Sequence, residues 1–216
     1  GVNLVRCNDC NLVFASPKLD DEFIEKYNSE YFKSAHGGLA NDNLTLSFFS
    51  AIAKLRYSYI QNFLDKNRLN VDSILEIGPG SGHFAKNWLT RHPKTKYYAV
   101  ETDSSCHNNL TNIGVMLIDS NTTINVDLVV ISHVLEHVSN PYEFIKQSTK
   151  SLKEDGILFI EVPCNDYQHK HFDEPHLLFF DKKPLNNLLL KSGFFNIELN
   201  YYGKRITTLQ KNNRLK

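Results

Sequence analysis

The chain has 216 residues, with 24 Lys and Arg against 24 Asp and Glu, so its formal net charge is zero. A neutral chain creates no overall field that would favour nucleic acid or an anionic membrane, and we expect a small-molecule substrate and neither of those partners. No apolar run approaches the roughly 18 residues of a membrane span and no signal peptide opens the chain, which predicts a soluble, cytoplasmic protein.

The N-terminal part of the chain carries a cysteine pair and two helical patterns. The four cysteines, at positions 7, 10, 106 and 164, do not have the density of a disulfide framework. Only Cys7 and Cys10 have metal-ligand spacing, and two thiolates supply half of a structural zinc site. Helical periodicity follows at residues 20–31 and 44–65. We expect residues 1–66 to form an N-terminal segment with a helical cap, and residues 67–216 to form the main domain.

Residues 73–102 predict a strand, turn, helix and strand that suit a nucleotide-like ligand. The first strand is a short apolar run, typical of burial on both faces of a parallel sheet. Gly78, Gly80 and Gly82 then let the backbone turn sharply and let a ligand approach with no Cβ in the way. Amides at the start of the next helix face such a ligand, and Glu101, at the tip of the second strand, is placed to bind two ribose hydroxyls.

The glycines follow the spacing E-x-G-x-G-x-G over residues 76–82, which departs from the G-x-G-x-x-G of dinucleotide-binding proteins. This spacing resembles the first motif of the class I S-adenosylmethionine-dependent methyltransferases, in which the loop passes under the methionine part of the cofactor. The resemblance implies an α/β, Rossmann-like sheet of seven strands, mostly parallel with a C-terminal antiparallel hairpin, and S-adenosylmethionine as cofactor. We assign cofactor contacts to Glu76, Gly78, Pro79, Gly80, Gly82, Glu101, Thr102, Asp119, Ser120, Ser132 and His133.

Residues 6–32 resemble the region that precedes the methyltransferase domain in a broad group of bacterial small-molecule enzymes. In that group, a zinc ribbon with two C-x-x-C pairs stands ahead of the domain. The sequence begins just ahead of what would be the second pair. We therefore expect that the first pair has been cut off and that Cys7 and Cys10 hold no metal.

Two further strands are expected at residues 115–118 and 127–133. Asp119 ends the first of them, where an acid binds the adenine amino group in the resembling family; the alternative is a solvated loop aspartate. The segment H-V-L-E-H-V-x-x-P, residues 133–141, resembles the corresponding motif of small-molecule methyltransferases, including quinone and cell-surface sugar enzymes. Because ligands of an open α/β sheet bind outside the carboxyl ends of its strands, this segment is expected beside the reactive sulfonium.

The C-terminal part of the chain completes the predicted sheet. The pattern indicates helices at residues 141–153 and 181–192 and a fifth strand at residues 157–162. A histidine-rich loop between them is expected over the same sheet edge. The closing hairpin is predicted from residues 194–200 and 204–210.

Methyl transfer to oxygen or nitrogen is an in-line displacement at a sulfonium, so the protein must mainly align the acceptor and accept its proton. Histidine suits the task of base because its unperturbed pKa lies near 6.5. His133 is the first candidate, and His171 and His176 follow. The alternative is structural, since Glu136 and His137 also suit capping a helix or binding loop amides.

A divalent metal is a second way to activate the acceptor. His133, Glu136 and His137 lie within one helical turn, and the later loop offers His171 or His176 as another ligand. Some quinone and small-RNA O-methyltransferases with an E-x-x-E-H motif hold a metal in this manner. His133 replaces the first acid of that motif here, so we expect catalysis without a metal and keep the metal as the alternative.

The predicted function is an S-adenosylmethionine-dependent methyltransferase for a small hydroxylated or anionic acceptor, with O-methylation favoured by the loop histidines. The family resemblance points to a cell-surface sugar of capsule or lipopolysaccharide, or its phosphorylated precursor. Two alternatives stand beside it: an NAD-dependent sugar epimerase or reductase, and a catalytically silent binding subunit that keeps the cofactor fold. The glycine spacing and the lack of a convincing Tyr-x-x-x-Lys pair count against the first. The sequence contains no recognisable signal for the identity of the acceptor or for the oligomeric state.

Overall fold

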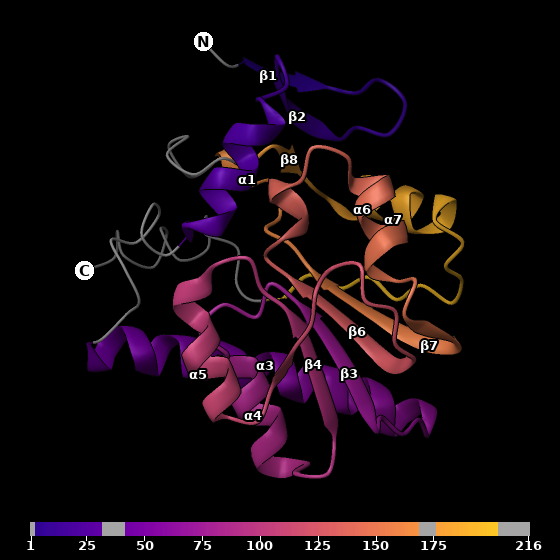
Figure 1. Ribbon diagram of the computed structural model, residues 1–216. Helices are drawn as coiled ribbons and strands as arrows, with labels where there is room; N and C mark the ends of the chain where they lie inside the picture. The colour runs from indigo at the N-terminus through magenta and orange to yellow at the C-terminus, as the bar shows by residue number, and fades with distance from the viewer. Residues whose placement is uncertain (1–2, 32–41, 169–175, 203–216) are drawn as a thin grey trace, which may run out of the picture.

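The computed structural model describes residues 3–31, 42–168 and 176–202 and folds them around a five-stranded parallel sheet (Figure 1). The strand order is β5-β4-β3-β6-β7. Within this sheet, the chain first forms the central strand β3. It then adds β4 and β5 on one side of β3, and β6 and β7 on the other side. The order therefore reverses between β3 and β6, which is the point where open α/β sheets bind ligands. The strands are β3 (Ser73–Ile77), β4 (Lys96–Val100), β5 (Met116–Leu117), β6 (Val126–Ser132) and β7 (Leu152–Glu161).

Helices cover both faces of the sheet, and alternate residues of its central strands enter two separate cores. On β3, Ile74 packs in the core with α3 (Asn43–Asn67), α4 (His83–Arg91) and α5 (His107–Asn112). The next residue, Leu75, packs in the core with α6 (Pro141–Ser148) and α7 (Lys182–Lys191), which lie on the opposite face (Figure 1). Burial on both faces explains why these strands are continuous apolar runs.

A small antiparallel sheet of β1 (Asn3–Arg6), β2 (Val13–Ser16) and β8 (Leu178–Phe179) lies beyond one end of the large sheet (Figure 1). Leu177, just before β8, donates its N–H to the Glu136 carbonyl at 2.7 Å. Glu136 lies in the short turn η2 (Leu135–His137) that follows β6. The N-terminal hairpin is thus tied, through β8, to the carboxyl edge of the large sheet. The remaining short helices are η1 (Ser104–Cys106) and η3 (Asp166–Gln168).

Both helices that were predicted ahead of the sheet are present. α1 (Asp21–Ser29) begins at Asp20, whose carboxylate accepts from the Glu22 N–H, and α3 begins at Asp42, whose carboxylate accepts from the Thr45 N–H. α3 buries Ala53, Ile60 and Leu64 in the same core as β3 and α4. The proposed boundary between residues 66 and 67 falls at the last turn of α3 and stays a prediction.

Two predictions differ from the structure at the C-terminal side of the sheet. The helix expected at residues 141–153 ends at Ser148, because Ser151 and Leu152 already bond and pair with the start of β6. The α/β, Rossmann-like fold is confirmed, and the large sheet has five strands within the described residues, where the prediction was seven for the whole chain. Residues 194–200 form no strand there, and residues 204–210 lie outside the described part of the chain.

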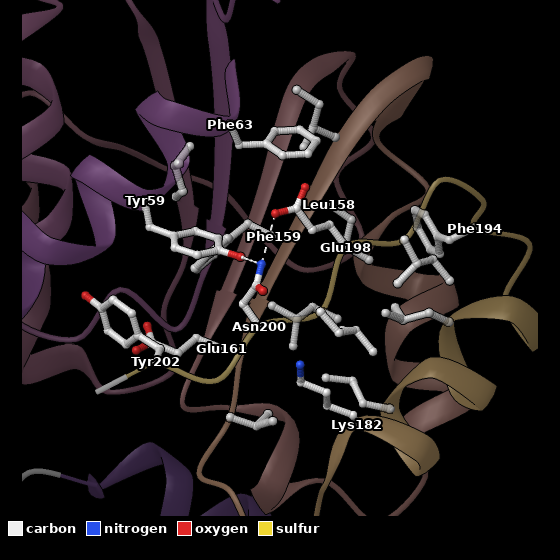
Figure 2. Close-up of a pocket in the computed structure, with 18 of the residues that line it drawn as sticks. Tyr59, Phe63, Leu158, Phe159, Glu161, Lys182, Phe194, Glu198, Asn200 and Tyr202 are labelled. Carbon is white, nitrogen blue, oxygen red and sulfur yellow. Dashed lines mark hydrogen bonds between the residues drawn. The ribbon is translucent and has the colours of Figure 1, made fainter. Parts of the chain in front are cut away.

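A cavity of about 1220 Å³ runs along β7 and not over the glycine turn. Figure 2 shows Tyr59 of α3 beside Asn200 and Tyr202 at one side of it, and Phe194 at the other side. Asn200 donates to the Tyr59 hydroxyl at 2.7 Å. Of the predicted cofactor residues, His133 alone is among those that line this cavity in the described structure. In the described parts of the chain, none of the helices is both long enough and apolar enough to cross a membrane.

Candidate active site

The glycine turn follows β3 directly and has the shape that the sequence predicts. Gly78, Gly80 and Gly82 all have positive φ angles, of 68°, 56° and 78°. These angles cost a residue with a Cβ about 1–2 kcal/mol each, so the turn favours glycine. Gly82 also caps α4 and, as a glycine, makes no side-chain hydrogen bond to the amides of the first turn of that helix. Those amides therefore keep their capacity to bind an anionic or carbonyl group.

Space as well as backbone conformation requires glycine at two of these positions. A Cβ on Gly82 would lie 2.8 Å from Leu110 and 2.9 Å from Ile113. A Cβ on Gly78 would lie 2.6 Å from the Cγ2 atom of Val134. The second contact shows that the turn after β3 touches the segment after β6, as expected for adjacent strands at the switch point.

Glu101 follows β4 and is bound to the glycine turn. Its Oε2 atom accepts from the Gly80 N–H at 2.8 Å, and its Oε1 atom accepts from the Asp103 N–H at 2.8 Å. Burial raises the pKa of Glu101 in spite of these two hydrogen bonds. The carboxylate therefore holds the turn against the end of β4, at the place where the sequence predicts a ribose.

Glu76 lies inside the protein, beneath the turn. Its side chain is 3% exposed and accepts a hydrogen bond from the Tyr97 hydroxyl at 2.6 Å. Burial raises the pKa of Glu76 to about 7, although Tyr97 and Arg56 act in the opposite direction. The residue that the motif places first is thus a buried carboxyl that supports β3 and β4.

The other predicted cofactor residues also lie along the carboxyl edge. Thr102 donates to the carbonyl of Asn28 at 3.3 Å, which places α1 over the end of β4. Asp119 and Ser120 follow β5 and are exposed. Ser132 ends β6 and donates to Glu161 Oε2 at 2.9 Å. The predicted residues thus follow the ends of β3, β4, β5 and β6.

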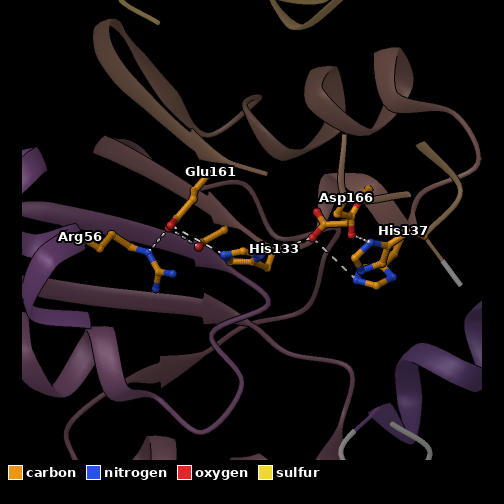
Figure 3. Close-up of polar contacts among 8 residues, drawn as sticks. Arg56, His133, His137, Glu161 and Asp166 are labelled. Atoms are coloured by element: carbon orange, nitrogen blue, oxygen red, sulfur yellow. Dashed lines mark hydrogen bonds and ion pairs between the residues drawn. The ribbon is translucent and has the colours of Figure 1, made fainter. Parts of the chain in front are cut away.

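His133 lies at the centre of a second polar cluster, shown in Figure 3. Its Nδ1 atom is 3.5 Å from Glu136 Oε1 and its Nε2 atom is 3.7 Å from Glu161 Oε1. Arg56, from α3, donates to Glu161 Oε2 at 2.5 Å. Burial lowers the pKa of His133, but the two carboxylates outweigh it and raise the pKa to about 9. Burial likewise raises the pKa of Glu161, while His133 and Arg56 outweigh it and lower the pKa to about 2.

The backbone of His133 is unusual, with a φ angle of 54°. Non-glycine residues are uncommon in this region, and such strained residues are enriched at functional sites. Its N–H donates to the Glu161 carbonyl at 2.9 Å, which holds this conformation between β6 and β7.

Glu136, His137 and His176 form a buried group beside His133. Their exposed fractions are 1%, 6% and 6%, and one ligand atom from each lies within 4.8 Å of the others. His176 Nδ1 is 2.7 Å from Asp166 Oδ2, and the rings of His176 and His137 are 4.8 Å apart in an edge-to-face arrangement. Both carboxylate oxygens of Glu136 are buried and accept no hydrogen bond from any residue that the structure describes.

The structure brings together His133, Glu136, His137 and His176 from the predicted candidates. His171 lies outside the described residues. The sequence analysis missed Arg56, Glu161 and Asp166. Glu161 lies near the end of the strand predicted at residues 157–162, on the same sheet edge, and this position could have identified it. No comparable pattern marks Arg56 or Asp166.

Cys7 and Cys10 lie in the turn between β1 and β2. The Cys7 N–H donates to the Leu12 carbonyl, and the Asn11 N–H donates to the Cys7 carbonyl. Backbone N–H groups of Cys10 and Asp9 lower the pKa of the Cys7 thiol. The hairpin therefore presents two thiols in one turn, a geometry suited to half of a four-ligand site.

Comparison with known proteins gives one family match. A family model described as a methyltransferase domain matches residues 49–199. No curated protein sequence matches the chain significantly.

Several solved structures share the fold at low sequence identity. A SAM-dependent methyltransferase of Thermotoga maritima, described as a possible histamine N-methyltransferase, is 19% identical, with a TM-score of 0.55 and 81% of each chain covered. A SAM-dependent methyltransferase of Leishmania major is also 19% identical, with a TM-score of 0.58 and 79% and 73% covered. The plantazolicin methyltransferase BamL, solved with a triazolic desmethylPZN analog and SAH, is 12% identical, with a TM-score of 0.57 and 79% and 73% covered.

The matched residues include the glycine turn, Glu101 and every residue of the His133 cluster. They make up well over half of the chain. This chain belongs to the methyltransferase-domain family, within the class I S-adenosylmethionine-dependent methyltransferases.

Proposed function

We propose that this protein transfers a methyl group from S-adenosylmethionine to a small hydroxylated or anionic acceptor. One observation carries the proposal: the glycine turn and the His133 segment follow adjacent strands and touch, through Gly78 and Val134. A cofactor bound over the turn would therefore present its sulfonium methyl group beside the polar cluster around His133. Such adjacency is what an in-line displacement needs, because the acceptor must approach the methyl carbon opposite the sulfur.

Each strand end has a proposed part in holding the cofactor. Residues 78–82 cradle its methionine end, with the free amides of α4 facing the carboxylate. Glu101 and Thr102 bind the ribose, and Asp119 and Ser120 lie by the adenine. Ser132 and His133 border the sulfonium. Glu76 acts from below, since its contact with Tyr97 holds β3 against β4.

The acceptor atom must lose a proton as its lone pair bonds to the methyl carbon and the carbon–sulfur bond breaks onto sulfur. His133 is the proposed group beside this atom, because half of its side chain is exposed whereas His176 is buried and bound to Asp166. With a pKa of about 9, His133 is mostly protonated at neutral pH in the free protein. It accepts a proton only after losing its own, so its first task is to bind and orient the acceptor.

The finer substrate class is a proposal from the family resemblance. A cell-surface sugar of capsule or lipopolysaccharide, or its phosphorylated precursor, offers the hydroxyls that O-methylation requires. The cationic pair of Arg56 and His133 is balanced by Glu161 and Glu136, so a neutral hydroxyl suits the cluster as well as an anion does.

Cofactor choice is tested first, by thermal unfolding with S-adenosylhomocysteine and with NAD. We expect stabilisation by S-adenosylhomocysteine alone, since a ligand that binds only the folded protein raises its unfolding temperature. Stabilisation by NAD alone would instead indicate an epimerase or reductase. Purified protein is then given labelled methyl donor and a panel of sugars, nucleotide sugars and quinols. Cofactor binding without transfer to any acceptor would leave a silent binding subunit as the better description.

A further inference from the structure

Glu136 has an environment that the protein alone does not satisfy. It is 1% exposed, and its two carboxylate oxygens accept no hydrogen bond within the described residues. The nearest charged partner is His133 Nδ1 at 3.5 Å, longer than a normal hydrogen bond. Burying a carboxylate in this way is costly unless a cation or donor compensates it. The two oxygens of Glu136 therefore keep the capacity to bind a further donor or a cation.

Two buried imidazoles stand where ligands of that cation would be. His137 Nε2 is 3.9 Å from Glu136 Oε1, and the ligand atoms of Glu136, His137 and His176 all lie within 4.8 Å of one another. Two ligands at about 2.1 Å around a tetrahedral ion lie about 3.4 Å apart, so these side chains need to close by little more than 1 Å. No other group of three or more His, Cys, Asp or Glu within the described ranges converges in this manner.

The contact of His176 with Asp166 fixes which nitrogen faces the group. Asp166 Oδ2 lies 2.7 Å from His176 Nδ1, so that nitrogen carries the proton and donates to the carboxylate. In a neutral ring, Nε2 is then the nitrogen that has the lone pair. Metal-binding histidines commonly donate their second N–H to a carboxylate, which sets the tautomer and orients the ring.

We propose that Glu136, His137 and His176 bind one divalent transition-metal ion of the zinc type. Two imidazoles and one carboxylate are a ligand set of catalytic zinc sites, which keep a further position open. His133 is not part of this set, because its two nitrogens face Glu136 and Glu161.

The role of such an ion rests on the proposed function, but its binding does not. His133 is half exposed and its Nδ1 atom lies 3.5 Å from Glu136 Oε1, so an acceptor bound at His133 would lie close to this ligand of the ion. Held by Glu136, His137 and His176, such an ion would make a bound acceptor hydroxyl more acidic, so that its proton could pass to solvent water. The oxygen lone pair would then bond to the methyl carbon, and the carbon–sulfur electron pair would stay on sulfur.

The test measures metal binding in a protein whose other metal-binding groups are removed. Cys7→Ser and Cys10→Ser eliminate binding by the hairpin thiols, and this double variant is the reference. After chelation and dialysis it is loaded with zinc, desalted and analysed for metal content, with affinity measured by calorimetry. We expect one zinc per chain, and cobalt substitution should give a visible absorption spectrum.

Three variants in that background separate the ligands from their neighbours. Glu136→Gln and His176→Gln should lose the bound zinc. Asp166→Asn should bind about 10–100-fold more weakly, as expected for a residue that orients a ligand. Glu161→Gln is the matched control, a buried carboxylate of the same cluster outside the ligand set, and should still bind one zinc. Wild-type stoichiometry in Glu136→Gln, or no zinc in the reference protein, would overturn the proposal.

S-adenosylhomocysteine binding is measured on the same samples and serves two purposes. Unchanged binding in Glu136→Gln shows that the variant is folded. If zinc binds but S-adenosylhomocysteine does not, the proposed function fails while the metal site stands. If S-adenosylhomocysteine binds and zinc does not, the metal site fails alone.

Discussion

Two regions at the same edge of the sheet differ in how completely the protein satisfies its own polar groups. In the glycine-turn region, Glu101 binds two backbone N–H groups and Glu76 is bound by Tyr97. In the histidine region, Glu136 is buried without a hydrogen bond from the described residues, and His133 has a positive φ angle. The two carboxyl groups of the first region are thus satisfied within the protein. The second retains unused binding capacity, which is typical of a site that is completed by what it binds.

Removing His133 should break the function of the second region without affecting the first. We expect His133→Ala to lower kcat about 100-fold or more, within the range that positioned proton-transfer groups contribute. Its affinity for S-adenosylhomocysteine should stay within about twofold. His92→Ala is the control, since His92 lies at the end of α4 and bonds to Tyr57. Turnover of the His133 variant at the wild-type rate, measured with labelled methyl donor, would exclude its proposed role.

The buried carboxyl of the first region should make stability depend on pH. The pKa of Glu76 is about 7 in the folded protein, against an ordinary value near 4.5. Because the folded state holds the proton more tightly, the stabilisation is complete below about pH 4.5 and is lost as pH rises through about 7. The difference amounts to about 3 kcal/mol.

Urea unfolding of wild type and Glu76→Gln at about pH 5 and about pH 8 measures this contribution. Between these values the wild type should lose about 2–3 kcal/mol more stability than the variant does. Glu154→Gln, an exposed glutamate of β7, should follow the wild type. Parallel pH dependence of wild type and Glu76→Gln would mean that Glu76 is not buried as the structure has it.

The two regions also differ in how far the sequence predicted them. The glycine turn, α4 and Glu101 lie within one short stretch, and each follows from local chemistry: positive φ at the glycines, an apolar strand, and an acid at the next strand end. The sequence therefore predicted this region with its correct order and edge. Glu76 is the one residue of this region whose direction the sequence did not predict. Its hydrogen bond from Tyr97 in the structure shows that its side chain points inward.

The histidine region joins residues that are distant in the chain, and sequence alone could not assemble it. Asp166 reaches His176 from a separate short helix, and Arg56 reaches Glu161 from a helix that precedes the sheet. Periodicity predicts that such elements exist but not which side chains meet. The same limit explains residues 194–200, whose alternating pattern predicted a strand that pairs with nothing in the described structure.

Within the first region, Glu101→Ala should weaken cofactor binding more than it weakens the fold. Hydrogen bonds to a charged group contribute about 1.5–3 kcal/mol, so the Kd for S-adenosylhomocysteine should rise about 10–100-fold. Glu101→Gln keeps one carbonyl oxygen for the Gly80 N–H and should lose less. Calorimetric titration compares the three proteins. An unchanged Kd in Glu101→Ala would remove this residue from the cofactor site.

The contact between Gly78 and Val134 joins the two regions, and a small substitution tests whether it matters. A methyl group on Gly78 would lie 2.6 Å from Val134 Cγ2, so either the turn or the histidine segment must shift. We expect Gly78→Ala to bind S-adenosylhomocysteine about tenfold more weakly, since 1–2 kcal/mol of strain is comparable to one factor of ten. Gly114→Ala is the matched control, because Gly114 has a φ of 91° and nothing within 4 Å of an added Cβ.

The double variant Gly78→Ala with Val134→Ala then separates backbone strain from the steric contact. Removing Val134 Cγ2 leaves the positive φ of residue 78 unchanged but clears the space that the new methyl group needs. If crowding between the two regions causes the loss, the second substitution should restore most of the affinity. If the loss comes from the backbone of residue 78 alone, the two effects should simply add, and the turn would hold the cofactor independently of the histidine segment.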